Sequence, residues 1–386
     1  MKKFAILSIS LATSMFLAAC GNTSNQQNQK EVGAPVQNEQ VDANSSFYFT
    51  ANEGSISKID ALTNKVIETF KVKGTVHNVQ ISPDDKIIGA TIVPSGTHEE
   101  HEENSEEETH ADHGSNDESH DTKGETNEDT SHGEHGTSEE NNDGKAAFYD
   151  AETNELIEEV EVGSHPAHIV FTENNQYALV TNNGDNNVSV IDMKTYKVIH
   201  TIATGNGPHG FRISSDSKFA YIANMNENTV SVIDLEEMKE TKKIVVGNVP
   251  VTTGVTTDGK TLVTTLNSEN LLSIVDIATE KVEKVAVGEG PAQVYIQSDD
   301  KFVWVANQGT SENPSNSITK VDLENKKVVA TIEVGKGAHG IVTSEDNKFV
   351  YVTNMYDNTV SVIDNDKNEV IATLNVGEMP NGITIQ

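Results

Sequence analysis

Short runs of apolar residues recur along most of the chain, and polar, turn-forming residues separate them. The run "FAYIANMNENTVSVIDLEEMKETKKIVVGNVP" from Phe219 resembles "FVYVTNMYDNTVSVIDNDKNEVIATLNVGEMP" from Phe349. Segments rich in Val, Ile, Thr and aromatic residues are typical of β-strands, and the Gly, Asn, Asp and Pro between them are typical of turns. The unit repeats about every 42 residues and offers four strand-like runs, which indicates one repeated supersecondary unit.

In the unit that starts at Pro208 the four runs are "HGFRIS", "FAYIAN", "TVSVID" and "TKKIVVG", which we call the first- to fourth-type runs. Each type occurs seven times. First-type runs begin at His77, Ala167, His209, Thr252, Ala292, His339 and Asn381. Third-type runs end at Asp60, Asp150, Asp192, Asp234, Asp276, Asp322 and Asp364. Four strands in a unit of this length are the signature of a propeller blade. We therefore predict an all-β fold, a seven-bladed β-propeller with four-stranded antiparallel blades, over residues 47–386.

The two ends of this repeat region are offset within the unit. It starts with a second-type run at Phe47 and stops after a first-type run at Asn381. The C-terminal strand is therefore expected to complete the first blade and close the ring, which leaves no open sheet edge. The motif "YVTN" at Tyr351, followed by "NTVSVID" at Asn358, resembles the YVTN, or YncE-like, family of seven-bladed propeller repeats. That resemblance implies the fold, but it does not imply one function, because members include surface proteins, candidate enzymes and binding modules.

The N-terminus has the pattern of a targeting segment. Lys2 and Lys3 precede the apolar stretch "FAILSISLATSMFLA", which is short for a membrane span. "LAAC", ending at Cys20, resembles the lipobox of bacterial lipoproteins and implies a signal peptide over 1–19, with lipid on the Cys20 sulfur. Residues 20–46 are then a flexible tether, and the protein is extracytoplasmic and anchored to the bacterial membrane only through its lipid. An ordinary secretory signal with an incidental cysteine is the alternative.

Charge is concentrated in one internal segment. The formal net charge of the chain is −33, and 18 Asp and Glu residues against one Lys give −17 between His98 and Asp143. Such a segment buries too little apolar surface to order itself, so we predict a disordered insertion over 97–144. An acidic surface repels phosphate, which argues against nucleic-acid partners.

The insertion follows a second-type strand and precedes a third-type strand. In an antiparallel blade that loop opens on the same face as the starts of the first-type strands. The insertion, which we call the histidine tract, contains seven of the 13 histidines: His98, His101, His110, His113, His120, His132 and His135. Three H-x-x-H pairs with neighbouring carboxylates suit zinc, nickel or copper, held weakly because the segment must order to bind. A solvated acidic loop with incidental histidines is the alternative.

A second histidine set lies at the starts of first-type strands: His77, His168, His209 and His339. These strands line the axis of a propeller, so the four side chains could meet in a three- or four-histidine site with tetrahedral, zinc-like geometry. The alternative is a turn residue of the repeat, since "PHG" and "AHG" at two of these positions resemble the family pattern.

Other polar residues suggest structural roles. The strand-end aspartates are expected to cap turns, and the Asn of "TN" and "AN" is expected to open the next turn. Arg212 is the only arginine, which argues against a site that clamps anionic substrates. We find no catalytic sequence motif, so no enzyme activity is predicted.

A secreted YVTN-type propeller with a histidine tract resembles AztD-type extracytoplasmic zinc metallochaperones. That resemblance implies a protein that carries zinc and delivers it to the solute-binding protein of a zinc ABC transporter. We expect the protein to be a monomer. Copper would compete for any such site. Two other classes remain open: a YVTN surface scaffold or adhesin without a specific metal function, and an enzyme with its active site in the channel.

Overall fold

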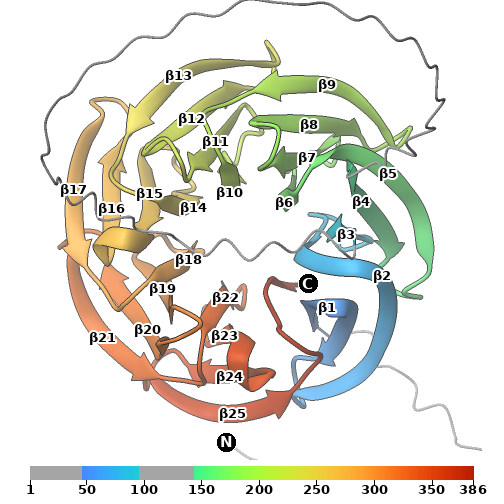
Figure 1. Ribbon diagram of the computed structural model, residues 1–386. Coiled ribbons are helices and arrows are strands. Elements are labelled where there is room, and N and C mark those ends of the chain that lie inside the picture. The colour runs from blue at the N-terminus through green and yellow to red at the C-terminus, as the bar shows by residue number, and fades with distance from the viewer. Residues whose placement is uncertain (1–45, 95–142) are drawn as a thin grey trace, which may run out of the picture. The chain divides into compact units, whose positions relative to one another are not determined.

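The computed structural model describes residues 46–94 and 143–386, which form antiparallel sheets arranged around a central axis (Figure 1). The predicted signal peptide and almost all of the tether and of the histidine tract lie outside these two ranges. Within the described ranges, no helix is both long enough and apolar enough to cross a membrane.

Six sheets make up the ring. The largest has the strand order β26-β1-β2-β3-β4-β5, formed by β26 (Ile383–Ile385), β1 (Phe47–Asp60), β2 (Lys65–Ile81), β3 (Ile87–Val93), β4 (Asp143–Asp150) and β5 (Leu156–Ser164). The other five are four-stranded, and each follows the chain order: β6 (Pro166–Phe171), β7 (Tyr177–Asn182), β8 (Asn187–Asp192) and β9 (Lys197–Ala203); β10 (Pro208–Ile213), β11 (Phe219–Asn224), β12 (Thr229–Asp234) and β13 (Lys239–Val245); β14 (Pro250–Val255), β15 (Thr261–Leu266), β16 (Leu271–Asp276) and β17 (Lys281–Ala286); β18 (Pro291–Ile296), β19 (Phe302–Gly309), β20 (Pro314–Asp322) and β21 (Lys327–Glu333); β22 (Ala338–Thr343), β23 (Phe349–Asn354), β24 (Thr359–Asp364) and β25 (Glu369–Asn375). Two short 3₁₀ helices, η1 (Asn267–Glu269) and η2 (Met355–Asp357), follow β15 and β23.

The all-β propeller is confirmed, but the prediction of seven separate four-stranded blades is wrong, because the described strands form six sheets. The difference arises at β1 and β2, each of which spans two of the expected runs. Thr75 in β2 pairs with Glu53 of β1 on one side and with Val93 of β3 on the other. Hydrogen bonding therefore continues through β2 and joins strands that the repeat assigned to two blades.

The predicted pairing of the last strand with the first is confirmed. β26 runs antiparallel to β1, with Tyr48 opposite Ile385 and Thr50 opposite Ile383. Backbone bonds continue the contact at both ends, from Gln386 N to Phe47 O (2.8 Å) and from Asn381 N to Ala51 O (2.8 Å). The N-terminal edge of this sheet is thereby covered, as a propeller requires.

The apolar core lies between neighbouring sheets. Val170 and Leu179 of one sheet pack against Phe211 and Ile222 of the next in a single buried cluster, and the same arrangement recurs around the ring. Trp304, the only tryptophan, is fully buried in such a cluster. The outermost strands, such as β9, are largely exposed, so they shield the sheets behind them.

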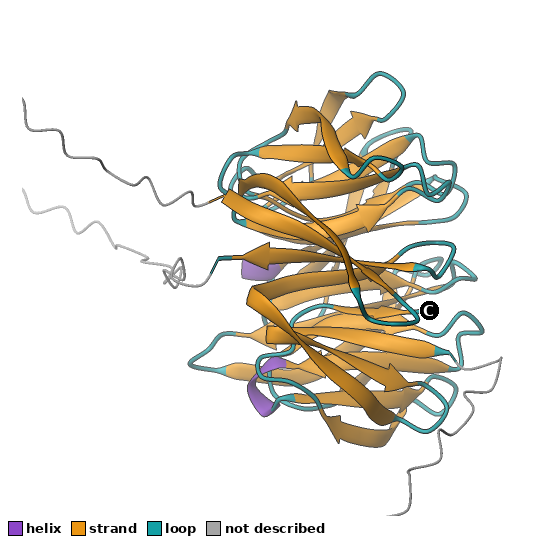
Figure 2. Ribbon diagram, turned by 90° about the vertical axis from the view of Figure 1, so that its right-hand side faces the viewer, coloured by secondary structure: helices purple, strands orange, loops and turns teal. Residues whose placement is uncertain are grey.

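The two faces of the ring differ in the chain segments that they present. The inner strands β6, β10, β14, β18 and β22 run in the same direction, and each starts opposite the end of the second strand of its sheet, as Pro250 does opposite Leu266. η1 and η2 follow those second strands and therefore mark the face at which the inner strands begin, which we call the histidine face. The chain ends at the opposite face, the C-terminal face (Figure 2).

The repeated Asp and Asn residues have the structural roles that the sequence predicted. Asp192 Oδ1 accepts backbone hydrogen bonds from Lys194 (3.1 Å) and Thr195 (2.8 Å), which closes the turn after β8. Asn182 at the end of β7 is fully buried and donates to Ser189 Oγ of the next strand (2.9 Å). These residues hold turns and strand ends, so they are not available for a binding site.

Candidate metal centre at the histidine face

Three histidines on adjacent inner strands converge at the histidine face. His77 lies in β2, His168 in β6 and His209 in β10, and these strands pack side by side around the axis. The ring centroids lie 5.8 Å apart for His77 and His168, 5.2 Å for His77 and His209, and 5.0 Å for His168 and His209. We call these three residues the histidine triad.

The ligand nitrogens of the histidine triad are spaced for a shared ion. One ring nitrogen from each residue can be chosen so that all three lie within 4.8 Å of one another. Zinc–nitrogen bonds of about 2.0–2.1 Å in a tetrahedron place ligand nitrogens about 3.4 Å apart. The nitrogens would therefore have to move closer together to bind one ion. Three histidines leave a fourth position open, as in zinc sites that exchange a ligand.

Hydrogen bonds indicate which ring nitrogen carries the hydrogen in two members. His77 Nδ1 lies 3.0 Å from Ala167 O, and His209 Nδ1 lies 3.2 Å from Val251 O. A carbonyl oxygen can only accept, so each Nδ1 carries the hydrogen and each Nε2 keeps its lone pair. Metal-binding histidines characteristically donate their other ring N–H to a carbonyl or carboxylate in this way.

His168 is the most buried member. Only 2% of its surface is exposed, and neither of its ring nitrogens has a hydrogen-bond partner among the residues described. A buried polar group without a partner is costly, by about 1–3 kcal/mol, and is therefore rare. A metal ion bound by all three imidazoles would satisfy one of these nitrogens.

The surroundings keep the imidazoles neutral. Burial lowers the pKa of His168 well below its ordinary value, and repulsion from His209 and His77 lowers it further. Burial, followed by repulsion from His77 and His339, lowers the pKa of His209 to about 3. Zinc binds the neutral imidazole, so at pH 7 these two residues do not have to release a proton before they bind.

A shift in pairing register occurs at each histidine of the triad and determines the direction of its side chain. The pairing register shifts between Val76 and Asn78, between Pro166 and Ile169, and between Pro208 and Phe211, and a histidine lies within each shift. Such bulges leave backbone groups unpaired and turn a side chain out of the alternating pattern. The local structure of these strands therefore determines where the histidines point.

Threonine hydroxyls satisfy the backbone groups that the bulges leave free. Thr181 Oγ1 accepts from His168 N (2.9 Å) and donates to His209 O on the next sheet (2.7 Å). Thr91 does the same between Asn78 N (3.0 Å) and Ala167 O (2.7 Å). Each hydroxyl therefore links two adjacent inner strands by hydrogen bonds beside the histidine triad.

Replacing Thr181 with valine should weaken zinc binding about 10- to 100-fold, the range typical for groups that orient metal ligands. The shape is conserved, but the link between His168 N and His209 O is lost. Thr353→Val is the matched control, because Thr353 makes the same link between Gly340 N (2.7 Å) and Asn381 O (3.0 Å), away from the histidine triad. A competition titration with a chromophoric chelator measures both; equal losses of affinity would contradict a positioning role for Thr181.

The fourth predicted residue, His339, does not belong to this group. Its Nδ1 lies 3.2 Å from Asn381 O and 3.3 Å from Gln293 Nε2. Burial and repulsion from His77 lower its pKa to about 4, so it is a neutral neighbour of the site. Of the two geometries that the sequence allowed, the described residues favour the three-histidine version.

The histidine tract lies outside the described residues, but its attachment points do not. Val93, at the end of β3, pairs with Thr75, two residues before His77. Asp143, at the start of β4, pairs with Ser164, four residues before His168. The two ends of the tract therefore lie on β3 and β4, each paired with a residue that precedes a member of the histidine triad by two to four positions.

A family comparison agrees with this architecture. The family described as "YNCE-like beta-propeller" matches residues 146–301 and 297–386, which together exceed half of the chain. The chain belongs to the YNCE-like β-propeller family. No curated protein matches it.

Solved structures similar to this YNCE-like propeller share its fold at low identity. Hydrazine synthase from Kuenenia stuttgartiensis is 19% identical, with a TM-score of 0.63, over 82% of this chain and 90% of that one. A functionally unknown protein from Desulfotomaculum acetoxidans is 13% identical, with a TM-score of 0.66, over 88% and 99%. The dihydro-heme d1 dehydrogenase NirN, in complex with DHE, is 13% identical, with a TM-score of 0.58, over 87% and 74%. At these identities the likeness concerns the fold alone.

Proposed function

We propose that this YNCE-like propeller is an extracytoplasmic, membrane-anchored zinc carrier that passes its ion to the solute-binding protein of an ABC transporter. The observation that carries the proposal is the histidine triad, in which the buried His168 has no hydrogen-bond partner among the described residues for either ring nitrogen. Zinc is the cargo of this site. Three imidazoles without a thiolate also accept copper or nickel, so the donor set limits the metal to this group.

The open fourth position suits a carrier better than a permanent structural site. Structural zinc sites use four protein ligands, whereas sites that exchange a ligand use three. No carboxylate or cysteine joins the three histidines in the part of the chain that the structure describes. A ligand from a receiving protein could therefore enter the coordination sphere before the ion leaves.

The two sequence features outside the described residues complete the proposal. The lipobox at Cys20 would keep the carrier at the membrane surface, where an anchored binding protein is also found. The seven histidines of the tract would bind several ions weakly and raise the local zinc concentration beside the histidine triad. Weak sites release zinc quickly, so the tract could pass its ions on to the tighter site at the histidine triad.

Deleting the tract should separate the two classes of site. Residues 97–142 are the segment to delete, because β4 begins at Asp143. We expect the weak class to disappear and one tight zinc per protein to remain, with slower loading at low zinc concentration. Metal content after gel filtration and stopped-flow loading measure these effects. A deletion that removes all zinc binding would contradict a separate site at the histidine face.

Delivery is tested by mixing the zinc-loaded protein with the metal-free solute-binding protein of a zinc transporter from the same organism. Transfer should be faster than release to a chelator of equal affinity, because a ligand from the receiving protein can enter the open position. Transfer at the rate of spontaneous dissociation would exclude a chaperone role. A scaffold or adhesin would show neither tight zinc binding nor transfer.

A further inference from the structure

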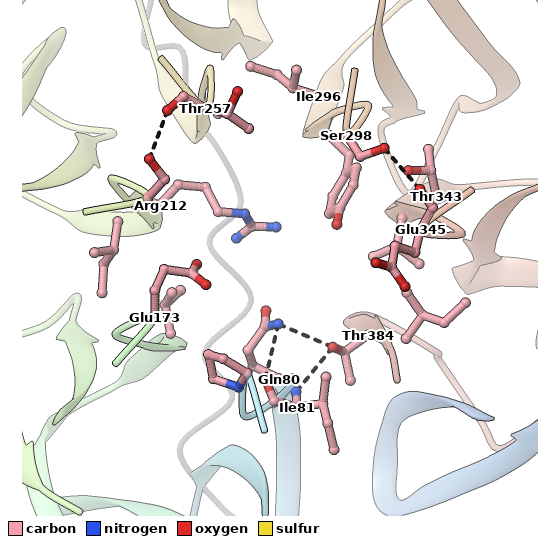
Figure 3. Close-up of a pocket in the computed structure, with 18 of the residues that line it drawn as sticks. Gln80, Ile81, Glu173, Arg212, Thr257, Ile296, Ser298, Thr343, Glu345 and Thr384 are labelled. Carbon is pink, nitrogen blue, oxygen red and sulfur yellow. Dashed lines mark hydrogen bonds between the residues drawn. The ribbon is translucent and has the colours of Figure 1, made fainter. Parts of the chain in front are cut away.

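A second candidate site lies at the C-terminal face, where the inner strands end. A cavity of about 560 Å³ opens there, lined by the last residues of the inner strands and the loops that follow them (Figure 3). Its size falls within the range of small-molecule sites in proteins. It lies at the opposite end of the inner strands from the histidine triad, so it raises a separate question of function.

Arg212 extends from the end of β10 into this cavity (Figure 3). It is the only arginine of a chain whose formal net charge is −33. Its Nη1 donates to Phe211 O (3.0 Å), and its guanidinium carbon lies 5.8 Å from the ring centroid of Tyr295. No ion pair joins it to a carboxylate among the residues of 46–94 and 143–386.

An arginine in this position requires an explanation. Its guanidinium remains charged in proteins and has five N–H donors, of which the protein uses one in the bond to Phe211 O. Arg212 is only half-buried, but a charge that is partly removed from water is still costly unless it is paired. The geometry that would pair with the free donors is a planar carboxylate bound through both oxygens.

The rest of the lining restricts the ligand further. Val170, Val294 and Val342 are among the apolar residues that line the cavity, and Gln80 is held by a hydrogen bond to Thr384 Oγ1 (3.2 Å). Glu173 and Glu345 also line the cavity (Figure 3). These carboxylates would repel a second negative charge, whereas the valines would favour an apolar body.

We propose that this cavity binds a small monocarboxylate with an apolar body, whose carboxylate pairs with Arg212. The number of arginines in the sequence argued against an anion site, but one arginine is enough when the fold places it in the cavity. This site does not depend on the zinc proposal, because the two share no residue.

The test uses isothermal titration of the whole mature protein with benzoate and isovalerate at pH 7. Benzoate should bind with one site per protein, and Arg212→Gln should weaken it about 10- to 100-fold, as expected for the loss of a charged hydrogen-bonding partner. Arg212→Lys should lie between the two, because it keeps the charge but loses the bidentate geometry. The circular dichroism spectrum and the urea unfolding midpoint of each variant serve as folding controls, and neither depends on zinc binding.

Two further ligands, one uncharged and one with two negative charges, are compared with benzoate in binding to the unmodified protein. Benzyl alcohol should bind more weakly than benzoate, because it cannot pair with the guanidinium. Succinate should also bind more weakly, because Glu173 and Glu345 oppose its second charge. No saturable benzoate binding below about 10 mM, equal binding of benzyl alcohol, or undiminished binding by Arg212→Gln would each overturn the proposal.

Discussion

Replacing His168 with alanine is expected to weaken zinc binding by the tract-deleted protein more than about 100-fold, beyond the usual effect of altering a group that only orients a ligand. His168 is the buried member whose two ring nitrogens lack hydrogen-bond partners among the described residues. Two histidines alone cannot form the three-ligand centre, so His77→Ala and His209→Ala should have similar effects. A competition titration at pH 7 measures the dissociation constants.

His339→Ala is the matched control for these variants. His339 is also buried and begins an inner strand, but it does not belong to the histidine triad. Its removal should change the zinc affinity by no more than about threefold, which is well under 1 kcal/mol. The exposed His200 provides a second control. If His339→Ala and His168→Ala reduced affinity equally, the ion would be bound by four histidines and not by the histidine triad alone.

The metal-free protein should lose stability as the pH falls from about 6.5 to 5, before most carboxylates titrate. An unfolded histidine has a pKa of about 6.5, whereas the folded protein lowers the pKa of His209 to about 3 and that of His339 to about 4. Over this window the unfolded chain takes up protons that the folded protein does not, so the free energy of unfolding falls. Each of these two residues should contribute about 1.5 kcal/mol to the fall.

Urea unfolding in the presence of a chelator measures this dependence. The variant His209→Gln, His339→Gln should lose about 3 kcal/mol less than the parent protein between pH 6.5 and 5. The difference between parent and variant cancels the contributions of all other titrating groups. One of these is Glu173, whose pKa is raised by desolvation, so that it makes the folded protein more stable as the pH falls. Parallel curves for parent and variant would show that these imidazoles are protonated in the folded protein.

Much of the fold could be predicted because each repeat unit contains the residues that determine its strands and turns. Strand-end aspartates, turn residues and alternating apolar positions recur in each unit, and five sheets follow them strand by strand. The six-stranded sheet formed by β26 and β1 to β5 could not be predicted from the number of repeats. β2 runs without a break from Lys65 to Ile81, so its first part pairs with β1 and its last part with β3, and the register shifts where Thr75 pairs with Glu53.

The candidate site was predicted only in part. The sequence placed His77, His168 and His209 at the starts of inner strands, but it also placed His339 there, and the spacing could not distinguish them. The distinction depends on tertiary contacts, since His339 Nδ1 lies next to Asn381 O, which only closure of the ring brings within 3.2 Å. The linking role of Thr181 was missed, although the repeated Thr of "VTN" at the same strand position was a signal for it.

The same limit applies to the second site. Arg212 belongs to a strand whose pattern is ordinary, and the apolar walls around it come from other sheets. A count of arginines gives the number of cationic groups but not their position in the fold. The residues that face one another across the axis are far apart in sequence, so their grouping could not be read from spacing alone.

X-ray absorption at the zinc edge of the tract-deleted protein, loaded with one equivalent of zinc, reports directly on whether the histidine triad binds the ion. We expect a four-coordinate ion with three imidazole nitrogens at about 2.0–2.1 Å, shown by the multiple scattering of imidazole rings, and a fourth light ligand. His168→Ala should lose one imidazole from this spectrum, and His339→Ala should leave it unchanged. A spectrum dominated by oxygen ligands without imidazole scattering would contradict a zinc centre at the histidine face.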